Sequence, residues 1–117
     1  MASILVVDDD EDILVLVRMV LSQNGHSVKT ACNGLEALEE IEREMPNLIL
    51  LDMRMPVMNG WEFAKELKAR HAQIPPVMVI TAAEDAAARA AEIGARGSIA
   101  KPFNLGQVLE AVKRELA

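Results

Sequence analysis

The sequence is poor in aromatic residues and in cysteine. It contains no tyrosine, one tryptophan, two phenylalanines and one cysteine among its 117 residues. The single cysteine, Cys32, excludes an internal disulfide and a zinc site built from several thiolates, and it suits a reducing compartment. No apolar run approaches the roughly 20 residues of a membrane span, and the N-terminus lacks the basic flank and cleavage pattern of a secretory signal. We therefore expect a cytoplasmic protein that does not contact membranes.

Basic residues are also scarce. Twelve Lys and Arg residues against eighteen Asp and Glu residues give a net charge of -6, and the sequence shows no basic patch. Such a balance repels nucleic acid and anionic lipid, so we expect no direct binding to nucleic acid. The 51% of hydrophobic residues suffices for a core, and the length suits one domain of ordinary size over residues 1–117.

Short apolar runs alternate with longer amphipathic segments. The short runs predict strands at residues 4–7, 27–31, 48–51, 77–80 and 98–100, of which the second is less buried. A helix is predicted after each strand, and Asn33, Asn59 and Asn104 are placed to cap three of them. The connections are short, so five right-handed βα units predict an α/β fold with an open, doubly wound parallel sheet rather than a barrel.

Apolar residues at helical spacing predict which helix faces are buried. The expected faces are Ile13, Leu16, Val17, Val20 and Leu21, ending at Gly25; Leu35, Leu38, Ile41 and Met45, ending before Pro46; Phe63, Ala64 and Leu67; an alanine-rich segment from about Glu84 to Ile93; and Leu105, Val108, Leu109, Val112 and Leu116.

Charged and hydroxyl side chains gather where the predicted strands end. In open α/β sheets, ligands bind beyond the carboxyl ends of the strands. The residues found there are Asp8, Asp9 and Asp10 after the first strand, Asp52 after the third, Thr81 at the end of the fourth, and Lys101 at the end of the fifth. The second strand leads only into Ala31, Cys32 and Asn33, so we expect it at the edge of the sheet.

Carboxylates held together at one rim need a cation. At about 4 Å, two unit charges repel by roughly 4 kcal/mol at an effective dielectric near 20. Hard oxygen ligands on an open site favour Mg²⁺, which shares its remaining positions with a phosphate. A carboxylate, a divalent cation, a hydroxyl and a lysine together describe phosphoryl transfer onto an aspartate.

Simpler roles also fit some of these residues. Asp10, Glu11 and Asp12 suit the acidic first turn of a helix. Thr81 and Glu84 have the spacing of a capping box, and a lone lysine such as Lys101 is more often solvated than functional.

Four ordered motifs resemble the receiver domain of two-component response regulators. They are Ile4-Leu5-Val6-Val7-Asp8-Asp9; Leu51-Asp52-Met53-Arg54-Met55-Pro56 with Asn59-Gly60; Thr81-Ala82; and Lys101-Pro102-Phe103. The resemblance covers essentially the whole chain. It implies a flavodoxin-like fold with strand order 2-1-3-4-5, as in the single-domain chemotaxis regulators.

The resemblance also implies a role for each residue at the rim. Asp52 is then the phosphoacceptor, taking its phosphoryl group from a phosphohistidine on a sensor histidine kinase or a histidine phosphotransfer protein. Asp9, Asp52 and the backbone carbonyl of Arg54 would hold Mg²⁺ directly, and Asp8 would act more through water. Thr81 would hydrogen-bond the phosphoryl group, Lys101 would pair with it, and the Lys101–Pro102 bond would be cis.

By the same resemblance, the chain is a signalling switch or a phosphate relay with slow self-dephosphorylation, not an enzyme. It would act either alone or as one domain of a longer protein.

One position departs from the family. Ser98 stands three residues before the lysine, where receivers usually carry an aromatic side chain that rotates inward. We therefore expect a weak long-range response to phosphorylation, because Ser98 buries little apolar area by moving.

Other classes of protein with this fold or these acids fit less well. A flavodoxin-like electron carrier needs a phosphate loop where this chain has three aspartates, and a dinucleotide enzyme needs G-x-G-x-x-G there. A calcium loop fails because Ile13 replaces its turn glycine and Met19 its closing glutamate. Aspartate-nucleophile phosphatases carry a second aspartate where Arg54 stands, and a pseudo-receiver would lack matched site residues that are all present here.

Overall fold

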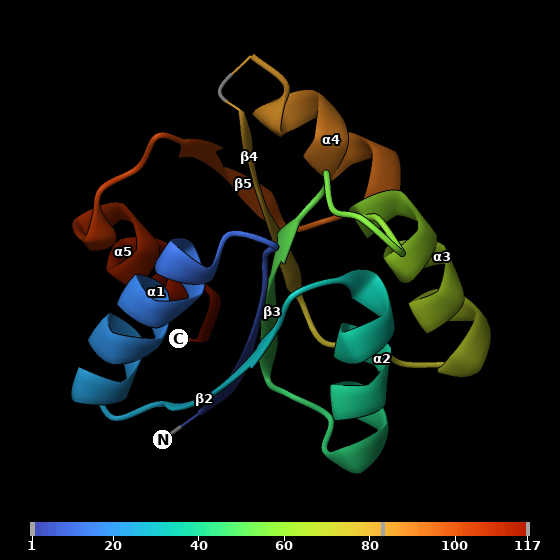
Figure 1. Cartoon of the computed structure of the whole chain (residues 1–117), viewed down its shortest axis with the longest axis horizontal. Helices are drawn as coiled ribbons and strands as arrows, with labels where there is room; N and C mark the ends of the chain where they lie inside the picture. Colours follow the sequence, from blue (N-terminus) through green and yellow to red (C-terminus); the bar gives the residue numbers. More distant parts are fainter. Residues whose placement is uncertain (1, 83, 117) are drawn as a thin grey trace.

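The structure, a computed structural model, describes residues 2–82 and 84–116 and has a parallel sheet between two layers of helices (Figure 1). Its elements in chain order are β1 (Ser3–Val7), α1 (Glu11–Gln23), β2 (Ser27–Ala31), α2 (Gly34–Arg43), β3 (Leu48–Asp52), α3 (Gly60–Arg70), β4 (Val77–Ala82), α4 (Ala86–Ile93), β5 (Gly97–Lys101) and α5 (Leu105–Leu116). Among the described residues, none of the helices combines the length and the apolar character needed to span a bilayer.

The strand order of the sheet is β2-β1-β3-β4-β5, and each neighbouring pair is parallel. This confirms the order and the edge position of β2 that the sequence predicts. Val7 at the end of β1 lies between Ala31 of β2 and Leu51 of β3. The connections from β1 to β2 and from β2 to β3 therefore place β2 and β3 on opposite sides of β1. This creates a switch point where Asp8 follows β1 and Asp52 ends β3.

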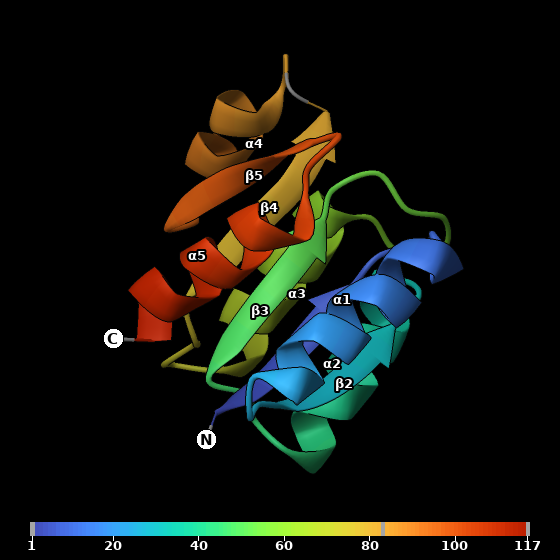
Figure 2. The same ribbon diagram turned by 90° about the vertical axis from the view of Figure 1, so that its left-hand side faces the viewer.

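Alternate residues of the central strands enter two separate cores. Leu5 and Val7 of β1 pack with α2, α3 and α4, whereas Ile4 and Val6 pack with α1 and α5. Figure 2 shows α1 and α5 lying across the near face of the sheet, with β3 visible between them. Because both faces are covered, these strands are continuous apolar runs, as buried parallel strands usually are.

Two of the predicted helix faces are partly wrong. In α1 the buried residues are Leu14, Val17 and Leu21, whereas Leu16 is 46% exposed. The run from Ile13 to Val17 is apolar throughout, so periodicity alone does not fix which side of this helix meets the sheet.

The buried face of α2 is Gly34, Ala37, Leu38 and Ile41, so Leu35 and Met45, at 45% and 40% exposure, point outward. The small residues at the start of α2 let it approach the loop after β3 closely. Gly34 N donates to the Met58 carbonyl at 2.9 Å, and a Cβ on Gly34 would lie 2.9 Å from that oxygen. The close approach of backbones, rather than large apolar side chains, therefore sets the orientation of α2.

A second close approach fixes the start of α3 against the end of β3. Gly60 N donates to the Met53 carbonyl at 2.9 Å. A Cβ on Gly60 would lie 2.8 Å from Met53 Cα and 3.0 Å from the Asp52 carbonyl oxygen. Since both of these atoms belong to the backbone, only glycine fits without moving the segment that carries Asp52.

We predict that Gly60→Ala lowers the free energy of unfolding by about 2 kcal/mol or more, because the added methyl group overlaps backbone. The control is Gly97→Ala in β5, where the new Cβ meets only the flexible end of Met78 at 3.4 Å. Urea unfolding followed by circular dichroism measures both. Equal stability of the two variants would contradict the role of this contact.

Candidate functional site

Three aspartates meet at the carboxyl ends of β1 and β3. One carboxylate oxygen from each of Asp8, Asp9 and Asp52 lies within 4.8 Å of the other two. Asp8 and Asp9 belong to the connection between β1 and α1, and Asp52 is the last residue of β3. Asp8 is fully buried and Asp52 is 4% exposed, whereas Asp9 is exposed. The three carboxylates that the sequence predicts at one rim therefore lie together there, and those of Asp8 and Asp52 are buried from solvent.

Lys101 brings a single positive charge to this cluster from β5. Its Nζ lies 3.0 Å from Asp8 Oδ2 and 3.6 Å from Asp52 Oδ2. The ammonium therefore sits between the two buried carboxylates, which excludes the interpretation of Lys101 as a solvated surface residue. The Lys101–Pro102 bond is cis, as the resemblance implies.

The buried carboxylate of Asp8 is incompletely satisfied. Its Oδ1 accepts the N–H of Asp10 at 2.9 Å. Its Oδ2 is buried and accepts no hydrogen bond of good geometry, so its only close partner among the described residues is the Lys101 ammonium. A buried oxygen of this kind is costly unless another positive group completes its surroundings.

The environment shifts the pKa of two of these groups. Burial raises the pKa of Asp52 to about 7, and the negative charge of Asp8 adds to the shift, while Lys101 and the N–H of Arg54 oppose it. Burial pushes the pKa of Lys101 down, but the charges of Asp8, Asp52 and Asp9 outweigh this effect, so its pKa lies above the ordinary value. Lys101 therefore stays charged at neutral pH. Asp52 is protonated easily at the same pH, so the cluster readily loses the negative charge of this carboxylate.

Thr81 lies inside β4 and is buried, so it does not cap a helix. The capping-box interpretation is wrong because β4 continues to Ala82 and α4 begins only at Ala86, after Asp85. Asp52 pairs with Ile80 and Thr81 pairs with Ala100. Thr81 is thus one residue beyond the level of Asp52, on the strand between Asp52 and Lys101.

Asp10 does serve as a helix cap. It is the N-cap of α1, and its Oδ1 accepts the N–H groups of Asp12 and Ile13 at 2.9 and 3.4 Å. Glu11 and Asp12 lie in the first turn, where negative charge is favoured. The simpler interpretation is therefore confirmed for this part of the acidic run, which separates it from Asp8 and Asp9.

Arg54 links the site to the neighbouring helices. Its backbone N–H points at Asp52 Oδ1 over 3.5 Å. Its side chain leaves the site, lies over the Trp61 ring and approaches Asp85 before α4. Sequence periodicity gives no signal for this arrangement, because it depends on how α3 and α4 are placed relative to each other.

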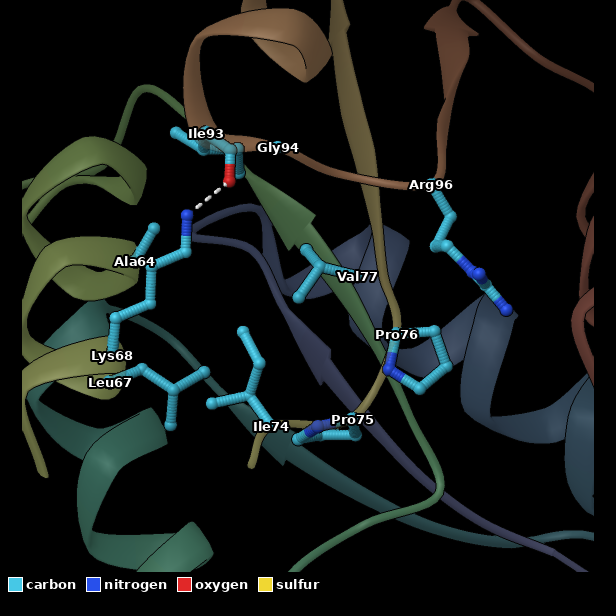
Figure 3. Close-up of a pocket in the computed structure, with 10 residues that line it drawn as sticks. All are labelled: Ala64, Leu67, Lys68, Ile74, Pro75, Pro76, Val77, Ile93, Gly94 and Arg96. Atoms are coloured by element: carbon cyan, nitrogen blue, oxygen red, sulfur yellow. Dashed lines mark hydrogen bonds between the residues drawn. The ribbon is translucent and has the colours of Figure 1, made fainter. Parts of the chain in front are cut away.

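A hollow of about 340 Å³ lies at the opposite end of β4, between α3 and α4 (Figure 3). Its two cationic residues already have partners: Lys68 Nζ donates to the Ile93 carbonyl at 2.7 Å, and Arg96 Nε donates to Glu115 Oε1 at 3.2 Å. No carboxylate, hydroxyl or thiol belongs to its lining. The reactive groups therefore lie at the other end of the sheet.

The sheet order and the Asp–Lys arrangement are those of a known family, and the model of the response regulator receiver domain matches residues 4–113. The chain belongs to this family. As a receiver, it is a signalling domain of two-component systems, in agreement with the function that the sequence motifs predict.

Similar proteins differ in how much of their own length the match covers. Sporulation initiation phosphotransferase F of Bacillus subtilis (strain 168) is 37% identical over 114 residues, which cover 97% of this chain and 92% of that protein. The alkaline phosphatase synthesis transcriptional regulatory protein PhoP of the same strain is 38% identical, covering 94% of this chain but 46% of PhoP. The structure of the chemotaxis response regulator CheY4 of Vibrio cholerae matches with a TM-score of 0.86 and 34% identity over 97% of this chain and 98% of that one. The chain therefore spans almost all of some relatives and about half of PhoP.

The residues of this receiver fit a divalent cation. The donor set consists of carboxylates, one of them exposed and open to solvent, which suits a hard cation that keeps several waters. The unsatisfied buried oxygen of Asp8 points to the same conclusion, since Lys101 alone does not balance three carboxylates. Family membership and geometry thus agree on an acidic pocket able to hold Mg²⁺.

We predict that the metal-free receiver becomes less stable as the pH rises from about 5 to 8. The ordinary pKa of Asp is 3.8 and that of folded Asp52 is about 7, so between these values the folded state keeps a proton that the unfolded state has lost. The stabilising effect of this proton on the folded state is full below the ordinary pKa of Asp and disappears as the pH rises through the pKa of folded Asp52. Urea midpoints of wild type and Asp52→Asn, measured in chelator across this range, test the effect. The two proteins differ only in this carboxyl group, so equal pH dependence in the two would contradict the assignment.

We predict that Mg²⁺ stabilises this receiver and that Asp9→Asn stabilises only the metal-free form. A ligand that binds the native state alone adds about 2.7 kcal/mol when its free concentration is 100 times Kd. Asp9→Asn removes a charge that repels Asp52 and one that would bind the metal, so it should raise Tm in chelator and weaken Mg²⁺ binding about tenfold or more. Thermal unfolding with and without Mg²⁺ measures both effects. The control is Asp12→Asn, an exposed acid of the first turn of α1.

Proposed function

We propose that Asp52 is the phosphoacceptor of this receiver and takes its phosphoryl group from a phosphohistidine. One observation carries the proposal above all. Asp52 ends a central strand, 4% exposed, with the Lys101 ammonium 3.6 Å from its Oδ2. A carboxylate oxygen of Asp52 forms the new bond to phosphorus, and the bond from phosphorus to the donor imidazole nitrogen breaks.

The groups around Asp52 suit this transfer. Lys101 would pair with a phosphoryl oxygen, and the Thr81 hydroxyl would donate a hydrogen bond to another. Asp9, Asp52 and the backbone carbonyl of Arg54 would hold Mg²⁺, with Asp8 acting more through water, and the bound metal would neutralise charge on the phosphoryl oxygens. The pKa of Asp52 is about 7 with Lys101 beside it, so Asp52 needs the charge of the bound metal as well to be fully ionised for attack at neutral pH.

The donor would be a sensor histidine kinase or a histidine phosphotransfer protein. Beside Lys101 lies an apolar hollow of about 500 Å³, lined among others by Ile13, Leu16 and Phe103. Val15, Leu16 and Met19 are exposed apolar residues of the same helix α1, and Leu16 belongs to the lining. An exposed apolar surface next to a charged reaction site supports docking of a protein that carries the phosphohistidine.

Residues 1–117 would act as one receiver unit with no direct contact to nucleic acid or membrane. Similarity to sporulation initiation phosphotransferase F supports a phosphate relay or a signalling switch. Each chain would accept one phosphoryl group and lose it slowly by hydrolysis, so it would be a phosphoacceptor rather than a turnover enzyme. A reducing cytoplasm suits this role, because Cys32 is a free thiol.

We predict that Mg²⁺ and a small acyl phosphate add one phosphoryl group to the wild type and none to Asp52→Asn. Intact-mass spectrometry measures the added mass, and Asp12→Asn, an acid outside the cluster, should react as the wild type does. Removing Mg²⁺ should slow the reaction about 100-fold or more, because the carboxylates and the incoming phosphate then repel each other. Equal labelling of wild type and Asp52→Asn would exclude Asp52 as the phosphoacceptor.

A further inference from the structure

Five side chains connect the loop after β3 with α3 and α4. We refer to this set as the Trp61 cluster: Arg54 in the loop, Trp61 in α3, and Asp85, Arg89 and Glu92 in and before α4. The Arg54 and Arg89 guanidinium groups lie 5.7 and 5.5 Å from the centroid of the indole ring. The ring nitrogen of Trp61 donates to Glu92 Oε1 at 2.8 Å. Trp61 is thus the centre of a polar contact between two helices and the loop.

The α4 helix packs on β4 and β5 through small side chains. Its buried residues are Ala86, Ala90 and Ile93, so it buries a small apolar area. Asp85 precedes it without a side-chain capping hydrogen bond. Near its other end, Lys68 of α3 donates to the Ile93 carbonyl, as Figure 3 shows. Polar contacts with α3 and the loop therefore add to the apolar packing that positions α4.

Arg54 joins the Trp61 cluster to the phosphoacceptor. Its N–H faces Asp52 Oδ1 at 3.5 Å, while its guanidinium lies 3.6 Å from Asp85. The Arg54 side chain is 65% exposed, so it is free to move between partners. A phosphoryl group on Asp52 would place up to two negative charges close to Arg54, in place of the single charge of the free carboxylate, and would compete with the carboxylate of Asp85.

We propose that the Trp61 cluster couples phosphorylation of Asp52 to the position of α4. In β5, Ser98 stands where an aromatic side chain would otherwise respond to phosphorylation. The proposal rests on the proposed function. In the unphosphorylated protein Arg54 lies over Trp61 and beside Asp85. In the phosphorylated protein Arg54 turns toward the phosphoryl oxygens, so the start of α4 loses a partner and the helix shifts. The two states then differ in their charge contacts, which gives phosphorylation the differential free energy that a switch requires.

The test uses beryllium trifluoride with Mg²⁺ as a phosphoryl mimic and backbone amide chemical shifts as the readout. In the wild type, we expect shifts beside Asp52 and across Ala86–Ile93, together with a change in Trp61 fluorescence. Asp85→Asn removes the anion that holds Arg54, and Trp61→Leu removes the ring. Both variants should keep the shifts beside Asp52 and lose about fivefold or more of the shifts in α4.

The control is Arg96→Ala, which breaks an ion pair between the α4–β5 connection and α5 and leaves the Trp61 cluster untouched. Its α4 shifts should equal those of the wild type. If both Asp85→Asn and Trp61→Leu show full α4 shifts, or if α4 of the wild type does not respond, the coupling is excluded while the proposed function stands. If the wild type shows no shifts beside Asp52 either, the proposed function and the coupling both fail.

Discussion

Two buried carboxylates facing one ammonium are the constraint on which the rest of this structure depends. The order of the strands brings Asp8 and Asp52 together at the switch point, and Lys101 reaches them from beyond β4. The apolar residues of both cores take these groups out of water, which makes every charge interaction among them stronger. The same burial leaves an excess of negative charge that the protein alone does not balance. A bound cation would relieve the electrostatic conflict that the fold itself creates, and would allow an anionic phosphoryl group to approach.

The connection that carries Arg54 is fixed at both ends and strained in the middle. Gly60 fixes its beginning by bonding to Met53, and Gly34 fixes its end by bonding to Met58. Between them Val57 has a φ of 70°, and Met58 N donates to the Pro56 carbonyl at 2.8 Å. A turn of this kind is rare and strained, and a β-branched residue makes it less favourable still. Strain held by its surroundings is typical of functional loops, and here it lies next to the residue that would supply a backbone ligand.

The sequence predicts the sheet and the acidic site well because both follow from local patterns. Runs such as Ile4–Val7 identify buried strands, and the carboxyl ends of parallel strands necessarily meet at one rim, so Asp8, Asp52 and Lys101 converge. The orientation of helices is less accessible. Leu16 and Leu35 have the right periodicity but point outward. In α1 the run from Ile13 to Val17 is apolar throughout and does not fix the buried side, and in α2 the glycine contact sets the rotation. The Trp61 cluster could not be predicted, since it depends on three segments whose relative placement no local pattern records.

The contrast between the site and the Trp61 cluster suggests how one chain combines a fixed reaction site with a movable output. At the site the charges are buried and close, so they hold one geometry until a cation or phosphoryl group changes the charge itself. In the Trp61 cluster the Arg54 guanidinium is largely exposed, and contacts of this kind are individually weak. Weak contacts can be exchanged at small cost, and α4 buries little apolar surface that would oppose its movement. A receiver with Ser98 in β5 has no aromatic ring to repack there, and exchange of charged partners around Trp61 would supply a difference between its two states near α4.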